Sequence, residues 1–109
     1  MAYNVLIAEP NEDIQELLEI LVGRRYRTLA TDTFELDEVD MAVVDPTGHG
    51  GLELTRRLHQ EGIPLVLISI YPPSADLLAL DPIAYLEKPF TPRDLELALL
   101  LAESRVHTA

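Results

Sequence analysis

The stretch AVVDPTGHGG, Ala42 to Gly51, determines how the rest of the chain is interpreted. An apolar run ends in one carboxylate, Asp45, and a proline and a glycine-rich turn follow at once. The run predicts a buried strand, and the turn residues predict a sharp change of direction. The segment 51–62 then has the pattern of a helix, with Leu54 and Leu58 facing inward. Asp45 is therefore expected between the end of a strand and the start of a helix.

Strands and helices alternate on both sides of this stretch. The continuously apolar segment 63–70 is typical of a strand that is covered on both faces. The segment 25–31 predicts a more exposed strand. Apolar runs predict the remaining strands over 3–9, 41–45 and 83–87.

Two further helices are marked by their caps. Over 11–23, Asn11 is the expected N-cap, and apolar side chains recur along one face at Ile14, Leu17, Leu18, Leu21 and Val22. Over 91–105, Thr91 is followed by Pro92 and Asp94, which resembles a capping box. The segment 32–40 is too short for a full helix, and 71–82 allows at most a short one.

Alternation of this kind predicts a parallel sheet with helices on both faces, in a single domain over residues 1–109. The sequence has 19 acidic and 8 basic residues, for a formal net charge of −11. This charge disfavours direct contact with nucleic acid or anionic lipid. Cysteine is absent, and we find no signal peptide or membrane span, so a cytoplasmic location is expected.

Polar side chains follow the strands at the ends that open parallel sheets use for binding. The predicted strands end at Glu9, Asp45, Ser69 and Lys88, so these groups are expected to meet at one edge. The set suits a phosphorylated carboxylate, with a Mg²⁺ ion near Glu9 and the Lys88 ammonium facing phosphoryl oxygens. Simpler alternatives stay open. In these alternatives Asp45 only caps the next turn, and Lys88 is its ordinary ion-pair partner.

Four segments together resemble the receiver domain of two-component response regulators, and the match is collinear over nearly the whole chain. They are VLIAEPNEDIQELL, MAVVDP with GGLEL, IPLVLIS and YLEKPF. The resemblance implies a flavodoxin-like, doubly wound sheet of five strands in the order 2-1-3-4-5 and a signalling module, not an enzyme. It places the phosphoryl acceptor at Asp45, which would also bind the metal, the first metal-site acid at Glu9 and the site hydroxyl at Ser69. Tyr85 takes the aromatic switch position, Lys88 the lysine position, and Thr47 would offer its carbonyl to Mg²⁺.

The resemblance also implies partners. A histidine kinase or phosphotransfer protein would supply the phosphoryl group. A downstream protein or a second copy would read the face of the fourth and fifth strand-helix units. The Lys88–Pro89 peptide bond is expected to be cis.

The sequence departs from this family pattern around the site. Pro10 stands where the family has its second acid, the loop holding Thr47 is short, and Ile70 follows Ser69 where a small residue is usual. These changes motivate an alternative, a pseudo-receiver that binds proteins without being phosphorylated. The leucine-rich last helix leaves two possibilities open, an exposed patch or a wider buried stripe. A flavin or nucleotide enzyme is disfavoured because the loop after the first strand lacks a phosphate-binding glycine pattern.

Overall fold

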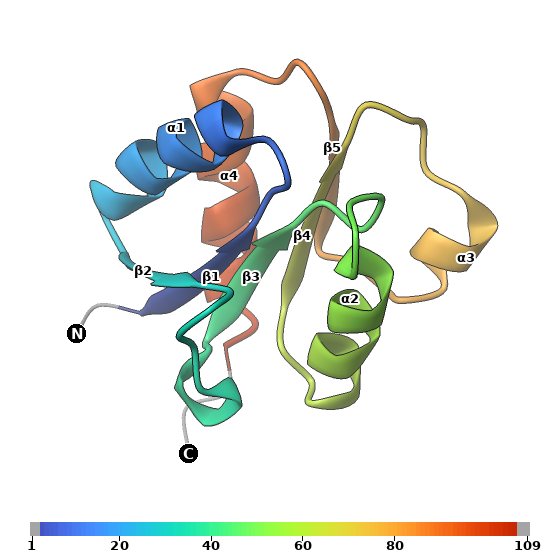
Figure 1. Cartoon of the computed structure of the whole chain (residues 1–109), viewed down its shortest axis with the longest axis horizontal. Helices are drawn as coiled ribbons and strands as arrows, with labels where there is room; N and C mark the ends of the chain where they lie inside the picture. The colour runs from blue at the N-terminus through green and yellow to red at the C-terminus, as the bar shows by residue number, and fades with distance from the viewer. Residues whose placement is uncertain (1–2, 107–109) are drawn as a thin grey trace.

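A computed structural model describes residues 3–106 as one parallel sheet with helices on both sides. Five strands pair in the order β2-β1-β3-β4-β5, which confirms the predicted flavodoxin-like arrangement (Figure 1). All neighbouring strands run parallel. The strands are β1 (Asn4–Ala8), β2 (Arg27–Ala30), β3 (Met41–Val44), β4 (Leu65–Ser69) and β5 (Ala84–Glu87).

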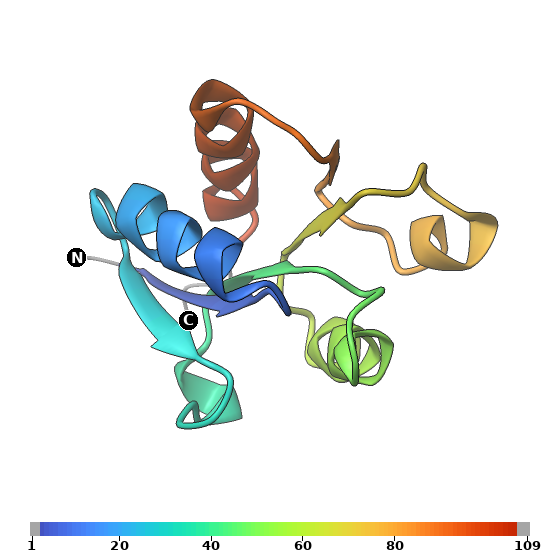
Figure 2. The same cartoon turned by 45° about the horizontal axis from the view of Figure 1, so that its top comes forward.

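The helices divide between the two faces of the sheet. Helix α1 (Glu12–Gly23) and helix α4 (Pro92–Glu103) cover one face, and helix α2 (Gly51–Gln60) covers the other (Figure 2). The segment predicted to be too short for a full helix forms one 3₁₀ turn, η1 (Leu36–Glu38). Helix α3 (Ala75–Leu78) is also short, as predicted.

Burial follows the position of each strand in the sheet. Every residue of β3 and β4 is buried, because helices cover both faces of these central strands. Strand β2 lies at the edge and is partly exposed, as the sequence predicted. The expected inward residues of α2 are also confirmed, since Leu58 is fully buried and Leu54 packs against the same apolar cluster.

The predicted caps form in both long helices. The Asn11 side chain accepts hydrogen bonds from the backbone of Asp13 and Ile14. Thr91 and Asp94 bond reciprocally in a capping box.

The leucines of helix α4 are partly buried and partly exposed. Leu95 and Leu99 are buried, whereas Leu97 and Leu101 are 48% and 56% exposed. No helix in the part of the chain that the structure describes is long and apolar enough to cross a membrane.

Gly51, the first residue of α2, packs directly against the end of β3. A Cβ atom built at position 51 would collide with the carbonyl oxygen of Asp45 and approach the Pro46 backbone. The obstacle is backbone and not a flexible side chain, so it cannot move aside without moving the strand end. The absence of a side chain at Gly51 therefore fixes where α2 meets Asp45.

We predict that Gly51→Ala lowers the free energy of unfolding by about 1–3 kcal/mol, as overpacking against a fixed backbone does. Gly23→Ala is the matched control, because a Cβ atom at position 23 would have no atom within 4 Å. This control is expected to be neutral or slightly stabilising, since alanine favours a helix more than glycine does. Urea denaturation of both variants measures the difference. Equal stability of the two variants would contradict the close packing at Gly51.

Candidate functional site

The Lys88 ammonium lies between two carboxylates at the carboxyl edge of the sheet. Its Nζ atom is 2.6 Å from Glu9 Oε2 and 2.7 Å from Asp45 Oδ2. These side chains come from the ends of β1, β3 and β5, whose following loops gather at one end of the molecule (Figure 1). The expected meeting of Glu9, Asp45 and Lys88 is therefore present.

The remaining carboxylate oxygens also accept hydrogen bonds. Asp45 Oδ1 accepts from the Thr47 backbone N–H at 2.8 Å and from the Thr47 hydroxyl at 2.5 Å. Glu9 Oε1 accepts from the Asn11 N–H at 3.2 Å. Asp45 thus caps its own turn and pairs with Lys88 at the same time, so the two alternatives considered from the sequence occur together.

The position of Lys88 is set by its backbone hydrogen bond to β4. The Lys88 N–H donates to the Ser69 carbonyl oxygen at 2.7 Å, which continues the pairing of β5 with β4. The next peptide bond, Lys88–Pro89, is cis as expected. The Lys88 side chain extends across the end of β4, since it bonds to residues that follow β3 and β1.

The ion pair sets the protonation of both partners. Burial alone would raise the pKa of Asp45, but the hydrogen bonds from Lys88 and Thr47 outweigh it and hold that pKa below its ordinary value. Burial alone would lower the pKa of Lys88, but the bonds and charges of Asp45 and Glu9 outweigh it and raise that pKa. Both groups are therefore charged over the whole neutral range.

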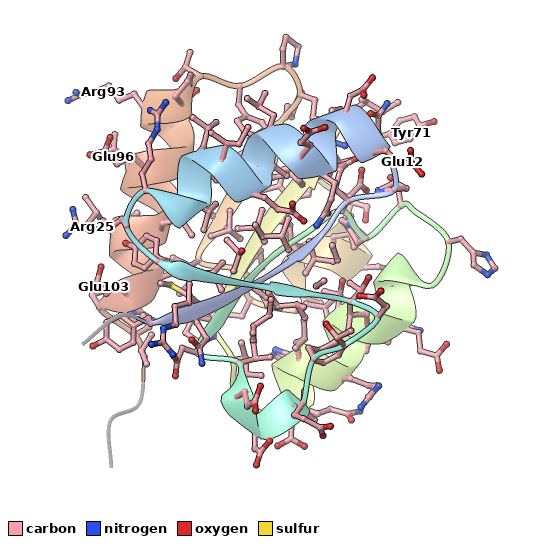
Figure 3. The ribbon with its side chains drawn as sticks, turned by 60° about the vertical axis from the view of Figure 1, so that its left-hand side comes forward. Glu12, Arg25, Tyr71, Arg93, Glu96 and Glu103 are labelled. Carbon is pink, nitrogen blue, oxygen red and sulfur yellow. The ribbon has the colours of Figure 1, made fainter. Side chains whose placement is uncertain are left out.

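Ser69 and Tyr85 are joined through the backbone of a single residue, Tyr71. The Tyr71 N–H donates to the buried Ser69 hydroxyl oxygen at 3.0 Å, and the Tyr71 carbonyl accepts from the Tyr85 hydroxyl at 2.8 Å. Tyr71 itself is 58% exposed. Figure 3 shows it at the same end of the molecule as Glu12, the first residue of α1. The two predicted switch residues thus share one connecting residue.

A cavity of about 260 Å³ opens beside Asp45 and is lined in part by Glu9, Pro10 and Gly48. The acid oxygens beside this cavity are already bonded within the protein. Pro10 contributes no oxygen from its side chain, and both acids are already paired with Lys88. Within residues 3–106, no three His, Cys, Asp or Glu side chains are grouped so that they could hold a metal ion. The two carboxylates that were expected to bind Mg²⁺ are therefore both bonded to Lys88.

Two contacts of the site were not predicted from the sequence. An aspartate side chain commonly accepts from the backbone N–H two residues on, and this rule covers the Thr47 N–H but does not predict the bond from the Thr47 hydroxyl. Tyr71 was not singled out at all, and no local pattern marks it, because its contacts are made by its backbone. The roles assigned to Glu9, Thr47, Ser69, Tyr85 and Lys88 stay predictions, while their positions are now defined.

Comparison with known proteins identifies the fold. No protein-family model matches the sequence, and no curated protein matches it. Among solved structures, the BeF3-activated receiver domain of DrrB is 14% identical with a TM-score of 0.80, covering 96% of this chain and 100% of that one. A putative pilus assembly-related protein from Burkholderia pseudomallei is 23% identical with a TM-score of 0.80, covering 97% and 92%.

A response regulator receiver domain protein from Methanospirillum hungatei, described as CheY-like, is 21% identical with a TM-score of 0.74. It covers 94% of this chain, and 96% of its own length is matched. The chain therefore has the fold of response regulator receiver domains. At these identities the likeness is one of fold.

We predict that Lys88→Met lowers the free energy of unfolding near neutral pH by about 3 kcal/mol, because it leaves buried carboxylates unpaired. This loss should shrink in acid, because the unpaired Asp45 of the variant takes up a proton, and because the wild type loses the ion pair as the pH falls through the lowered pKa of its Asp45. In the wild type, the same stabilisation should also fade as the pH rises through the raised pKa of Lys88. Denaturant titrations across the pH range measure both limits. Arg56→Met, on the exposed face of α2, is the control. A pH-independent loss would contradict the ion pair.

A second prediction concerns Tyr71. Ser69→Ala removes the acceptor of the Tyr71 N–H, so the Tyr71 amide should exchange faster with solvent and the Tyr85 ring resonances should shift. NMR spectra measure both effects. Ser104→Ala is the control, because it removes a hydroxyl that bonds to the Leu101 carbonyl in α4. Unchanged Tyr85 signals in Ser69→Ala would show that the two hydroxyls are not coupled.

Proposed function

We propose that the chain is a signalling receiver domain that accepts a phosphoryl group on Asp45. The donor is the phosphohistidine of a partner histidine kinase or phosphotransfer protein. The contact between Lys88 Nζ and Asp45 Oδ2, at the carboxyl edge of a receiver fold, is the observation that carries this proposal. It places a fixed positive charge beside a buried acid, where phosphoryl charge would develop.

The transfer step needs few protein groups. An oxygen of Asp45 forms a bond to phosphorus as the phosphorus–nitrogen bond of the donor breaks. The bonding electron pair remains on the imidazole, which takes up a proton from solvent. Lys88 is a compact charge that can then pair with a phosphoryl oxygen, and the Ser69 hydroxyl can donate to another. The acyl phosphate would carry more negative charge than the carboxylate that it replaces.

The response would pass through Tyr71. If the Ser69 hydroxyl turns toward the phosphoryl group, the Tyr71 N–H that bonds to it must move, and the Tyr85 hydroxyl bonded to the same residue moves with it. We propose that a downstream partner or a second copy of the chain reads this change on the face formed by α3, β5 and α4. Exposed apolar side chains on these elements and on the loop before α3 support this choice, namely Tyr71, Leu78, Leu97 and Leu101.

A second candidate is a pseudo-receiver that binds a partner protein without being phosphorylated. The occupied state of Asp45 favours this candidate. Its side chain is only 5% exposed, and both oxygens already accept hydrogen bonds from Thr47 or Lys88. In this case the Glu9–Lys88–Asp45 cluster would serve to hold the binding surface in shape.

Phosphorylation distinguishes these candidates. Incubation with acetyl phosphate, with and without Mg²⁺, should add one phosphoryl group to the intact mass, and hydroxylamine should remove it. Asp45→Asn should abolish the modification. Asp32→Asn, which removes an exposed acid, should retain it. Modification that survives Asp45→Asn would refute the assigned acceptor. No modification with acetyl phosphate or with a phosphorylated histidine phosphotransfer domain would leave the pseudo-receiver as the function.

A further inference from the structure

The pocket beside Glu9 and Asp45 already contains a cation, the Lys88 ammonium. Lys88 bonds to Glu9 and Asp45 together, at 2.6 and 2.7 Å. Thr47 and Asn11 donate to the oxygens that Lys88 does not reach. Each carboxylate oxygen in the pocket therefore has a donor within the protein, and an incoming metal ion would have to displace one of them.

Pro10 stands in place of the second acid of the receiver pattern and also fills space beside the pocket. A Cβ atom built on Gly48 would lie 2.9 Å from Cγ of Pro10, so the proline ring sits against the loop that follows β3. Carbon atoms thus line the side of the cavity where a further carboxylate would have to enter. Pro10 is therefore part of the packing of the site.

Burial makes the exchange of cations unfavourable. The side chains of Lys88, Glu9 and Asp45 are only 11%, 0% and 5% exposed. Mg²⁺ gives up its waters reluctantly and demands near-octahedral oxygen ligands. Displacing the ammonium would leave Lys88 charged and without these partners in a largely buried position.

We infer that Lys88 is the resident counter-ion of this pocket and that the pocket does not take up Mg²⁺. The inference concerns the same residues as the proposed phosphoryl acceptor, but it does not rest on phosphorylation. It makes Glu9 a partner of Lys88 and not a metal ligand. The domain would then hold its site in one arrangement whether or not a divalent cation is present.

The test is a titration of the free protein with MgCl₂ to millimolar concentrations, followed by amide NMR at constant ionic strength. The wild type should show no saturable shift at Glu9, Asp45 or Thr47. Pro10→Asp should gain saturable shifts at these residues, because it restores an oxygen ligand beside Glu9. Asn11→Asp is the matched control. It adds the same charge one residue further on and can still cap α1, and it should gain nothing.

A second variant tests the role of Lys88 directly. Lys88→Met keeps both carboxylates and removes the ammonium, and it should also gain saturable Mg²⁺ shifts if it remains folded. Should it unfold, the wild-type titration still decides whether the pocket takes up Mg²⁺. Saturable binding by the wild type, or no gain in a folded Lys88→Met, would overturn the inference, whereas no gain in Pro10→Asp would mean that Lys88 alone excludes the metal. Neither outcome depends on whether acetyl phosphate modifies Asp45, so the two proposals fail separately.

Discussion

The contact of one ammonium with two carboxylates organises the carboxyl edge of this sheet. Lys88 follows β5, yet it bonds to residues that follow β1 and β3, so its side chain spans the end of β4. The partners lie 79 and 43 residues away in sequence. The cluster therefore forms only when the strands have paired in their final order, and it fixes three loops relative to one another.

Removing one member of such a cluster costs more free energy than the intact cluster contributes to stability. Bringing charges out of water costs several kcal/mol for each ion, and their attraction offsets this cost only when the remaining oxygens are also bonded. Thr47 and Asn11 meet this requirement here. Among the described residues, no buried side-chain nitrogen or oxygen lacks a partner. The cluster therefore contributes more to the choice of one arrangement than to total stability, and the loss of any single member is costly.

The parts of the structure that depend on local sequence could be predicted, and those that depend on side-chain direction could not. The buried strands and the caps at Asn11 and Thr91 depend on residues close in sequence. The order of strands and helices along the chain could therefore be predicted. Strand ends also placed Glu9, Asp45 and Lys88 at a common edge. The sequence did not show that Glu9 would turn toward Lys88, because this depends on the geometry of a strand three positions away in the sheet. Helix α1 shows the same limit. Leu17 belongs to the apolar stripe, yet it is 53% exposed while its neighbour Leu18 is buried.

The contrast between β4 and the residues after it indicates which part of the site can move. All residues of β4 through Ser69 are buried, whereas the next two residues, Ile70 and Tyr71, are 63% and 58% exposed. A displacement of Tyr71 therefore breaks few buried contacts, while a displacement of β4 would disturb both apolar clusters. The Tyr71 backbone bonds to Ser69 on one side and Tyr85 on the other. A change in the direction of the Ser69 hydroxyl can thus reach the surface across a single exposed residue, with the rigid sheet left in place. Because the Lys88 N–H bonds to the Ser69 carbonyl, the fixed cluster and the movable segment meet at Ser69.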